Sequence, residues 1–150
     1  MTDPVTTALF EPHTREQLRA IVAAMTPDEL HRYACSYNWD DGPEPMHWVA
    51  ERPDCDLGTA VTVFWLTSPF TFGSRSAPTP TPASRDPAIA TLAAFIRDRV
   101  NSGAYTRQQI SVDPVPAFIP NRLQLELLRR RGLPQVFLAP TPGRSIRSGP

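Results

Sequence analysis

Lysine is absent from this sequence, and all fifteen of its basic side chains are arginines. Proline, in contrast, is abundant, with eighteen residues among 150. GC-rich coding favours arginine, alanine and proline, and we take it as the reason for this composition rather than a functional need for guanidinium groups. The missing lysine therefore excludes no class of function by itself.

Long apolar runs and cysteines are also scarce. No apolar run approaches the ~20 residues of a membrane-spanning helix, and residues 1–14 lack the basic and apolar regions of a secretory signal. We therefore expect a cytoplasmic protein without membrane association. Its two cysteines, Cys35 and Cys55, would then be reduced thiols. A chain of this length buries about 68–70% of its unfolded surface, so it needs neither a disulfide nor a metal to fold.

The sequence has no recognised motif for a metal or a catalytic nucleophile. His31 and Cys35 are four residues apart on one predicted helix, and His47 and Cys55 follow. This set lacks the close cysteine pair of ordinary zinc modules, so we expect no metal and no cofactor. Either cysteine could be combined with a histidine and an aspartate, but no nucleophile signature surrounds them. We therefore predict no catalytic residue.

What the sequence does hold is one unusual stretch, residues 38–66, which reads NWDDGPEPMHWVAERPDCDLGTAVTVFWL. It contains all three tryptophans of the chain, Trp39, Trp48 and Trp65. It also contains six carboxylates, which are Asp40, Asp41, Glu44, Glu51, Asp54 and Asp56. Not all of these can cap helices, so several are expected to face solvent.

Two of the carboxylates have a local structural explanation. Asp41 precedes Glu44 by three residues, which fits a variant capping box for a helix that starts near Pro43. Pro53 ends that helix, and either Asp54 or Asp56 caps the next one. Capping therefore explains part of the acidic cluster better than a calcium loop or an acid–base pair does, because the calcium-loop order of ligands is absent.

The segment after Asp56 is the most apolar of the chain. Leu57, Ala60, Val61, Phe64 and Trp65 repeat at helical spacing, and further apolar residues fill the opposite side. Such a helix is expected at the centre of the fold, with Trp65 buried. A strand is the alternative, because valine, threonine and phenylalanine favour extended structure. We favour the helix because of the caps before it.

The remaining elements predict an all-α fold, a compact bundle of about six short helices with a Pro-rich crossover loop, within a single domain. Residues 1–13 are expected to be loose, and Thr106–Ile110 are expected to form a further helical turn. Asn121 is expected to cap a last helix with Leu123, Leu127 and Leu128 on its inner face. The predicted segments are a helical unit at 14–67, a Pro-rich loop or linker at 68–86, C-terminal helices at 87–139 and a disordered tail at 140–150. Within the C-terminal helices, residues 111–120 are expected to be extended, and residues 134–139 are expected to form a short strand or a packed tail.

The charge is unevenly distributed along the chain although it sums to zero. Residues 1–56 hold eleven acids and four bases, a net charge of −7, and residues 57–150 hold four acids and eleven bases, a net charge of +7. This division can steer a partner or let the two halves attract each other. Arg129, Arg130 and Arg131 suit the end of a helix, so nucleic acid is not an expected partner.

The chain carries the motif NWDDG and, further along, the motif PDCDLGTA followed by FWL. With these two motifs, residues 28–70 resemble the domain-of-unknown-function 4274 family. The resemblance implies a bacterial, helical domain but no activity. The residues it marks as the family signature are Asn38, Trp39, Asp40, Asp41, Gly42, Cys55, Asp56, Gly58 and Thr59.

From these observations we expect a non-catalytic protein-interaction module with a basic protein partner. The binding residues would be those of the acidic, aromatic turn, namely Asn38, Trp39, Asp40, Asp41, Gly42, Glu44 and Trp48. By analogy, a small acidic bacterial domain of this kind suits an immunity or antitoxin-type inhibitor. The alternative hypothesis is a metal-dependent or carboxylate-based hydrolase that uses the same acidic cluster.

Overall fold

The computed structural model describes residues 3–71, 81–82 and 86–146. Thr14 and Thr26 each form a full capping box, and Asp56, Asp86 and Asn121 cap later helices with their side chains. The elements in chain order are α1 (Pro4–Phe10), α2 (Arg15–Ala24), α3 (Pro27–Ser36), the 3₁₀ helix η1 (Trp39–Asp41), α4 (Glu44–Glu51), α5 (Leu57–Leu66), β1 (Phe70–Thr71), β2 (Thr81–Pro82), α6 (Pro87–Asn101), α7 (Pro114–Ala117), α8 (Arg122–Arg130) and the 3₁₀ helix η2 (Gln135–Phe137). The predicted helical unit at 14–67 corresponds to α2, α3, α4 and α5, and the predicted C-terminal helices include α6 and α8.

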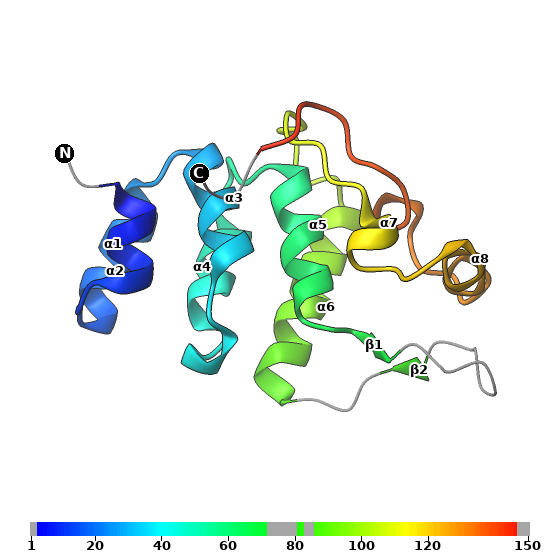
Figure 1. Cartoon of the computed structure of the whole chain (residues 1–150), viewed down its shortest axis with the longest axis horizontal. Helices are drawn as coiled ribbons and strands as arrows, with labels where there is room; N and C mark the ends of the chain where they lie inside the picture. Colours follow the sequence, from blue (N-terminus) through cyan, green and yellow to red (C-terminus); the bar gives the residue numbers. More distant parts are fainter. Residues whose placement is uncertain (1–2, 72–80, 83–85, 147–150) are drawn as a thin grey trace.

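Successive helices form pairs that stand side by side. Figure 1 shows α1 with α2, then α3 with α4, then α5 with α6, and the segments around α7 and α8 beyond them. Helix α5 contacts α3, α4 and α6, so it lies at the centre of the bundle. This arrangement confirms the all-α bundle. It also explains why α5 is apolar on every face, because neighbours surround it.

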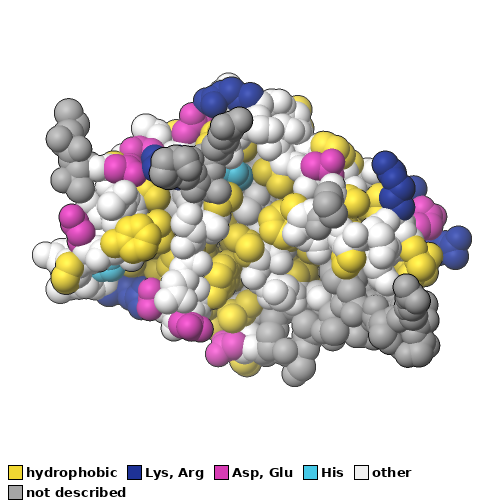
Figure 2. Space-filling model, viewed as in Figure 1, with side chains coloured by type: hydrophobic (Ala, Val, Ile, Leu, Met, Phe, Trp, Pro, Cys, Tyr) yellow, Lys and Arg dark blue, Asp and Glu magenta, His cyan; other side chains and the backbone are white. Residues whose placement is uncertain are grey.

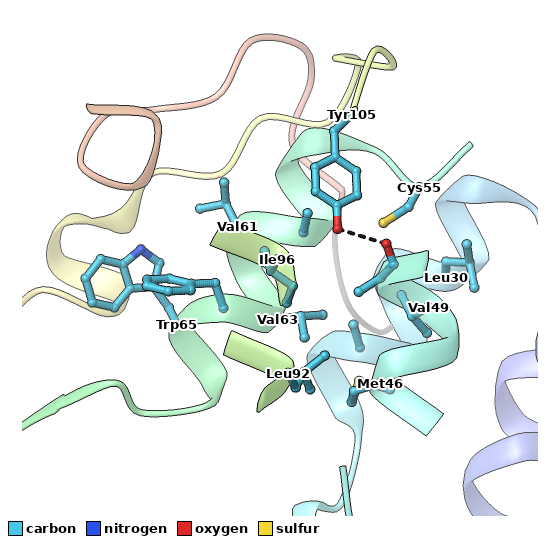
Figure 3. Packing of buried hydrophobic residues seen from close by; sticks show 14 of the residues in the cluster. Leu30, Met46, Val49, Cys55, Val61, Val63, Trp65, Leu92, Ile96 and Tyr105 are labelled. Atoms are coloured by element: carbon cyan, nitrogen blue, oxygen red, sulfur yellow. Dashed lines mark hydrogen bonds between the residues drawn. The ribbon is translucent and has the colours of Figure 1, made fainter. Parts of the chain in front are cut away.

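The core gathers around α4, α5 and α6. Figure 3 shows Val63 of α5 close to Leu92 and Ile96 of α6, whereas the Trp65 indole points away from them on the other side of α5. The predicted burial of Trp65 is confirmed, since its side chain is 4% exposed. Its indole Nε1 donates to the carbonyl of Phe137 at 2.9 Å. No helix in the described part of the chain is long and apolar enough to cross a membrane.

Several sequence predictions were wrong at the two ends of the chain. Residues 4–10 form α1, because Asp3 accepts from the backbone N–H of Val5 and starts a helix within the segment predicted as loose. The described part of the predicted disordered tail, residues 140–146, is held to the fold, because the Oγ1 of Thr141 donates to the Ile110 carbonyl at 2.8 Å and the N–H of Arg144 donates to the Gln109 carbonyl at 3.1 Å. Residues 147–150 lie outside the described part of the chain.

The C-terminal third also differs in detail from the prediction. The segment 106–109 is not helical, and α7 interrupts the segment predicted as extended. In α8, Leu128 is buried as expected, but Leu123 is 58% exposed and Gln124 is buried in its place. The tail at 134–139 forms η2 rather than a strand, and the burial of Phe137 and Leu138 confirms the alternative of a packed tail.

The Pro-rich crossover is described only at its ends. Strand β1 pairs with β2 in antiparallel register, with Phe70 opposite Pro82. The other residues of the predicted loop, 72–80 and 83–85, lie outside the described residues.

Candidate functional site

The acidic turn, defined here as residues 38–44, joins α3 to α4 and is held by a small set of contacts. The side chain of Asn38 accepts from the N–H of Asp40 at 3.1 Å and caps η1. Gly42 has a φ of 92°, a conformation that glycine adopts without strain. The Tyr37 hydroxyl donates to the Gly42 carbonyl, and Arg15 Nη2 donates to the Asp41 carbonyl at 3.3 Å. The turn therefore has a defined shape.

Three carboxylates of the acidic turn face solvent. Asp40, Asp41 and Glu44 are all exposed. Within the part of the chain that the structure describes, none of the three forms an ion pair. Figure 2 shows acidic side chains along the lower left edge of the molecule, where the α3–α4 connection lies in Figure 1. They form an acidic rim, and the one basic side chain described in contact with the turn, Arg15, bonds to a backbone carbonyl rather than to these carboxylates.

The predicted cap at Asp41 was wrong. Helix α4 begins at Glu44 after Pro43, and no side chain caps it. Pro43 and Pro45 have no backbone N–H, so the first turn of α4 has fewer unpaired donors for a cap to satisfy. Asp41 belongs instead to η1, and its carboxylate is left for solvent.

Of the two tryptophans predicted to face a partner, only one is partly exposed to solvent. Trp39 is half-buried, and its ring meets that of Tyr37 edge to face at 5.7 Å. Trp48 is 7% exposed and lies in the core, with the Arg19 guanidinium 5.6 Å from its ring centre. Its helix α4 packs against α2, α5 and α6, so α4 is buried on more than one face. The assignment of Trp48 to the binding surface is therefore corrected.

Tyr37 is a functional candidate that the sequence did not single out. It stacks edge to face with both Tyr33 and Trp39. Burial, and then the nearby Asp41 carboxylate, raise the pKa of Tyr37 to about 12, so its hydroxyl stays a donor to the turn at neutral pH. No local sequence signal marks this role, because it depends on the chain folding back at Gly42.

Two clefts flank the acidic turn. One, of about 270 Å³, lies toward α1 and α2 and is lined by Leu9, Tyr33 and Tyr37 among others. The other, of about 510 Å³, lies between the start of α4 and the start of α6, and we call it the α4–α6 cleft. Its lining includes Arg15, Asp41, Pro43, Glu44, His47, Ala88, Thr91 and Leu92. Arg15 and Asp41 line both clefts, so the turn forms the ridge between them.

The other half of the signature is buried and structural. Asp56 is fully buried and caps α5 by accepting from Gly58 N at 2.9 Å, which confirms one predicted cap. It also accepts from the N–H groups of Gln109 and Ile110, at 2.8 and 3.1 Å, and from Arg107 Nη1 at 2.7 Å. The carboxylate therefore fixes the segment after α6 to the start of α5.

The neighbours of Asp56 complete this attachment. A Cβ on Gly58 would overlap the Ile110 carbonyl, so only glycine allows the two segments to meet so closely. Thr59 is buried, and its Oγ1 lies 3.0 Å from the Nδ1 of buried His31. Burial lowers the pKa of His31 despite the opposing influence of Asp56 and Asp28. These signature residues hold helices together and do not reach the surface.

Ion pairs join the acidic half of the chain, residues 1–56, to the basic half, residues 57–150. Asp28 pairs with Arg144 at 2.6 Å and with Arg107 at 3.8 Å. Arg129 and Arg130, in contrast, pair with Glu126 of their own helix. The attraction between the halves is therefore carried by Asp28 and Asp56, and the acidic rim takes no part in these pairs.

The residues weighed for metal binding or nucleophilic catalysis do not converge. Cys35 Sγ lies 3.5 Å from His31 Nε2, and Cys35 is exposed. Cys55 is buried, and this burial raises its thiol pKa to about 12, which disfavours a nucleophilic thiolate. His47 instead contacts the Phe95 ring at 4.5 Å. Among the described residues, no three His, Cys, Asp or Glu side chains are grouped to hold a metal ion.

Comparison with known proteins gives one family match. Residues 25–98 match the model of a family described as Domain of unknown function (DUF4274). No curated protein and no solved structure matches the chain. The matched region begins just before α3 and ends within α6, so it includes the acidic turn and the signature residues around Asp56. Over this region the chain resembles the DUF4274 family, as the two sequence motifs predicted.

Proposed function

We propose that this chain is a non-catalytic interaction module that binds a basic surface of a partner protein through the acidic rim, Asp40, Asp41 and Glu44. The observation that carries the proposal is that three exposed carboxylates lie on a well-held turn without an ion pair among the described residues. The chain uses Asp28 and Asp56 for its own ion pairs, so the rim charges are not needed for attraction between its halves.

The shape of the turn supports the same function. Hydrogen bonds from Tyr37 and Arg15 to its carbonyl groups hold the turn before any partner arrives, so binding loses little additional conformational freedom. The half-buried Trp39 lies beside the carboxylates, and tryptophan within a polar rim is a frequent composition of binding hot spots. The rim would speed encounter with a basic surface, and Trp39 would add contact area.

A role as an immunity or antitoxin-type inhibitor is the finer form of this proposal. Such a protein acts by covering the basic surface of a toxin, and an acidic rim on a compact helical domain suits that task. The hydrolase alternative gains no support, because the six carboxylates of the acidic stretch are divided among different environments. Three lie on the exposed rim, Glu51 lies beside His47, Asp54 pairs with Arg52, and Asp56 is buried and fully hydrogen-bonded.

The test compares capture of partners by wild type and by the double reversal Asp40→Arg/Glu44→Arg. The matched control is Glu11→Arg/Asp98→Arg, which makes the same change in net charge at two exposed acids away from the turn. We expect a basic protein to be captured by wild type and by the control but not by the rim reversal, with equal thermal melting of all three. A sharply lowered melting temperature for the rim reversal, with no basic partner captured, would show that the rim has an internal role.

A further inference from the structure

The α4–α6 cleft offers apolar surface directly behind the acidic rim. Leu92 of α6 is buried at its base, and Pro43 and Ala88 form parts of its walls. Its volume of about 510 Å³ lies within the ~300–1,000 Å³ range of ligand pockets in proteins. Figure 2 shows hydrophobic surface next to the acidic side chains at the lower edge of the molecule. An apolar hollow bordered by carboxylates differs in chemistry from the exposed rim alone.

The charges around the cleft favour a cationic occupant. Asp41 and Glu44 line it and have no ion pair among the described residues. Arg15 also lines it, but one of its guanidinium N–H groups is committed to the Asp41 carbonyl. His47 lies 3.9 Å from Glu51 and against the Phe95 ring. With Asp40 nearby on the same turn, the local balance is negative.

We propose that the α4–α6 cleft receives an apolar side chain that stands between basic residues in a segment of the partner protein. This inference rests on the proposed function and adds to it a determinant of specificity. Arginines on either side of the apolar residue would meet Asp41 and Glu44, while the apolar side chain would displace water from Pro43, Ala88 and Leu92. A basic segment without such an anchor would bind more weakly.

The experiment uses acetylated and amidated pentapeptides, Arg-Arg-Leu-Arg-Arg and Arg-Arg-Gly-Arg-Arg, with Glu-Glu-Leu-Glu-Glu as the charge control. Binding to the full chain is measured by nuclear magnetic resonance titration. We expect the leucine peptide to bind about tenfold more tightly than the glycine peptide, as burial of one large apolar side chain implies. The acidic peptide should not bind, and the largest shifts should come from Gly42 and Thr91.

Thr91→Trp would fill the cleft from α6, and Ala94→Trp is its matched control. Both positions are exposed on α6, but Ala94 lines a different cleft, which lies against Phe64 and Phe70. We expect Thr91→Trp to abolish the preference for leucine over glycine and Ala94→Trp to keep it, with both variants melting like wild type. Retention of the preference in Thr91→Trp would overturn the proposal.

The remaining outcomes separate this inference from the proposed function. Equal binding of the leucine and glycine peptides by wild type would overturn the anchor site and leave a basic partner supported. Failure of both basic peptides to bind would overturn both. A dimer of this chain in sedimentation, lost in Thr91→Trp, would make a second copy the occupant and overturn the assignment to a partner protein.

Discussion

Replacement of Asp56 by alanine tests the buried attachment between α5 and the segment after α6. The carboxylate is fully buried and accepts from three backbone N–H groups and one guanidinium group. Its loss would remove the cap of α5 and leave the buried Ile110 N–H without its acceptor. A cap alone contributes about 0.5–2 kcal/mol, and each buried donor left unpaired costs about 1–3 kcal/mol.

The loss of the ion pair adds less, because Arg107 is partly exposed and also lies 3.8 Å from Asp28. We therefore expect Asp56→Ala to lower the free energy of unfolding by about 4 kcal/mol, within the range for breaking a buried pair. Asp56→Asn should recover part of the loss, because asparagine also caps helices, but its amide would place N–H groups opposite other donors.

Equilibrium unfolding in urea at 25 °C measures this effect. Asp86→Ala is the control, because Asp86 caps α6 through Ala88 N at 2.7 Å on an exposed surface. The control should lose about 0.5–2 kcal/mol. A loss for Asp56→Ala no larger than that of the control would refute the reasoning, because it would mean that the contacts to residues 107–110 contribute nothing.

Three further predictions follow from single positions. Trp65→Ala should lower the free energy of unfolding by about 3–5 kcal/mol in the same assay, and a loss below about 1 kcal/mol would contradict the central position of α5. Asp41→Ala removes no helix cap, so it should change the free energy of unfolding by less than about 0.5 kcal/mol. Because His31 has a pKa lowered by burial, its unfolded form takes up a proton first, so wild type loses stability as pH falls below about 6.5. The difference in free energy of unfolding between wild type and His31→Gln should narrow as pH falls below about 6.5, and a constant difference would contradict the burial of a neutral imidazole.

Local signals predicted most of the helices, because a cap and its first turn lie within four residues of each other. The caps at Asp56 and Asn121 were predicted in this way, and Thr14, Thr26 and Asp86 cap their helices by the same local contacts. The same reasoning failed at Asp41, because two prolines removed donors that a cap would have satisfied and shifted the helix start.

The sequence predicted one feature of the candidate site, which is the exposure of its charged turn. Asp40, Asp41 and Glu44 are exposed as expected, but Trp48 is buried because α4 has neighbours on several sides. The partners of Asp56 lie 51–54 residues further along the chain, beyond the reach of any periodicity. The α4–α6 cleft likewise joins residues from two distant helices, so no sequence pattern reveals it.

The central claim, that the acidic rim recruits a basic partner, is tested most directly by the association rate with the captured partner at rising ionic strength. For wild type we predict a rate that falls as salt screens the rim, whose field extends about 8 Å at physiological salt. Asp40→Arg/Glu44→Arg should slow association more than it speeds dissociation and should flatten the dependence on salt, whereas Glu11→Arg/Asp98→Arg should behave like wild type. An association rate that is insensitive to salt, and equal in wild type and the rim reversal, would contradict the claim.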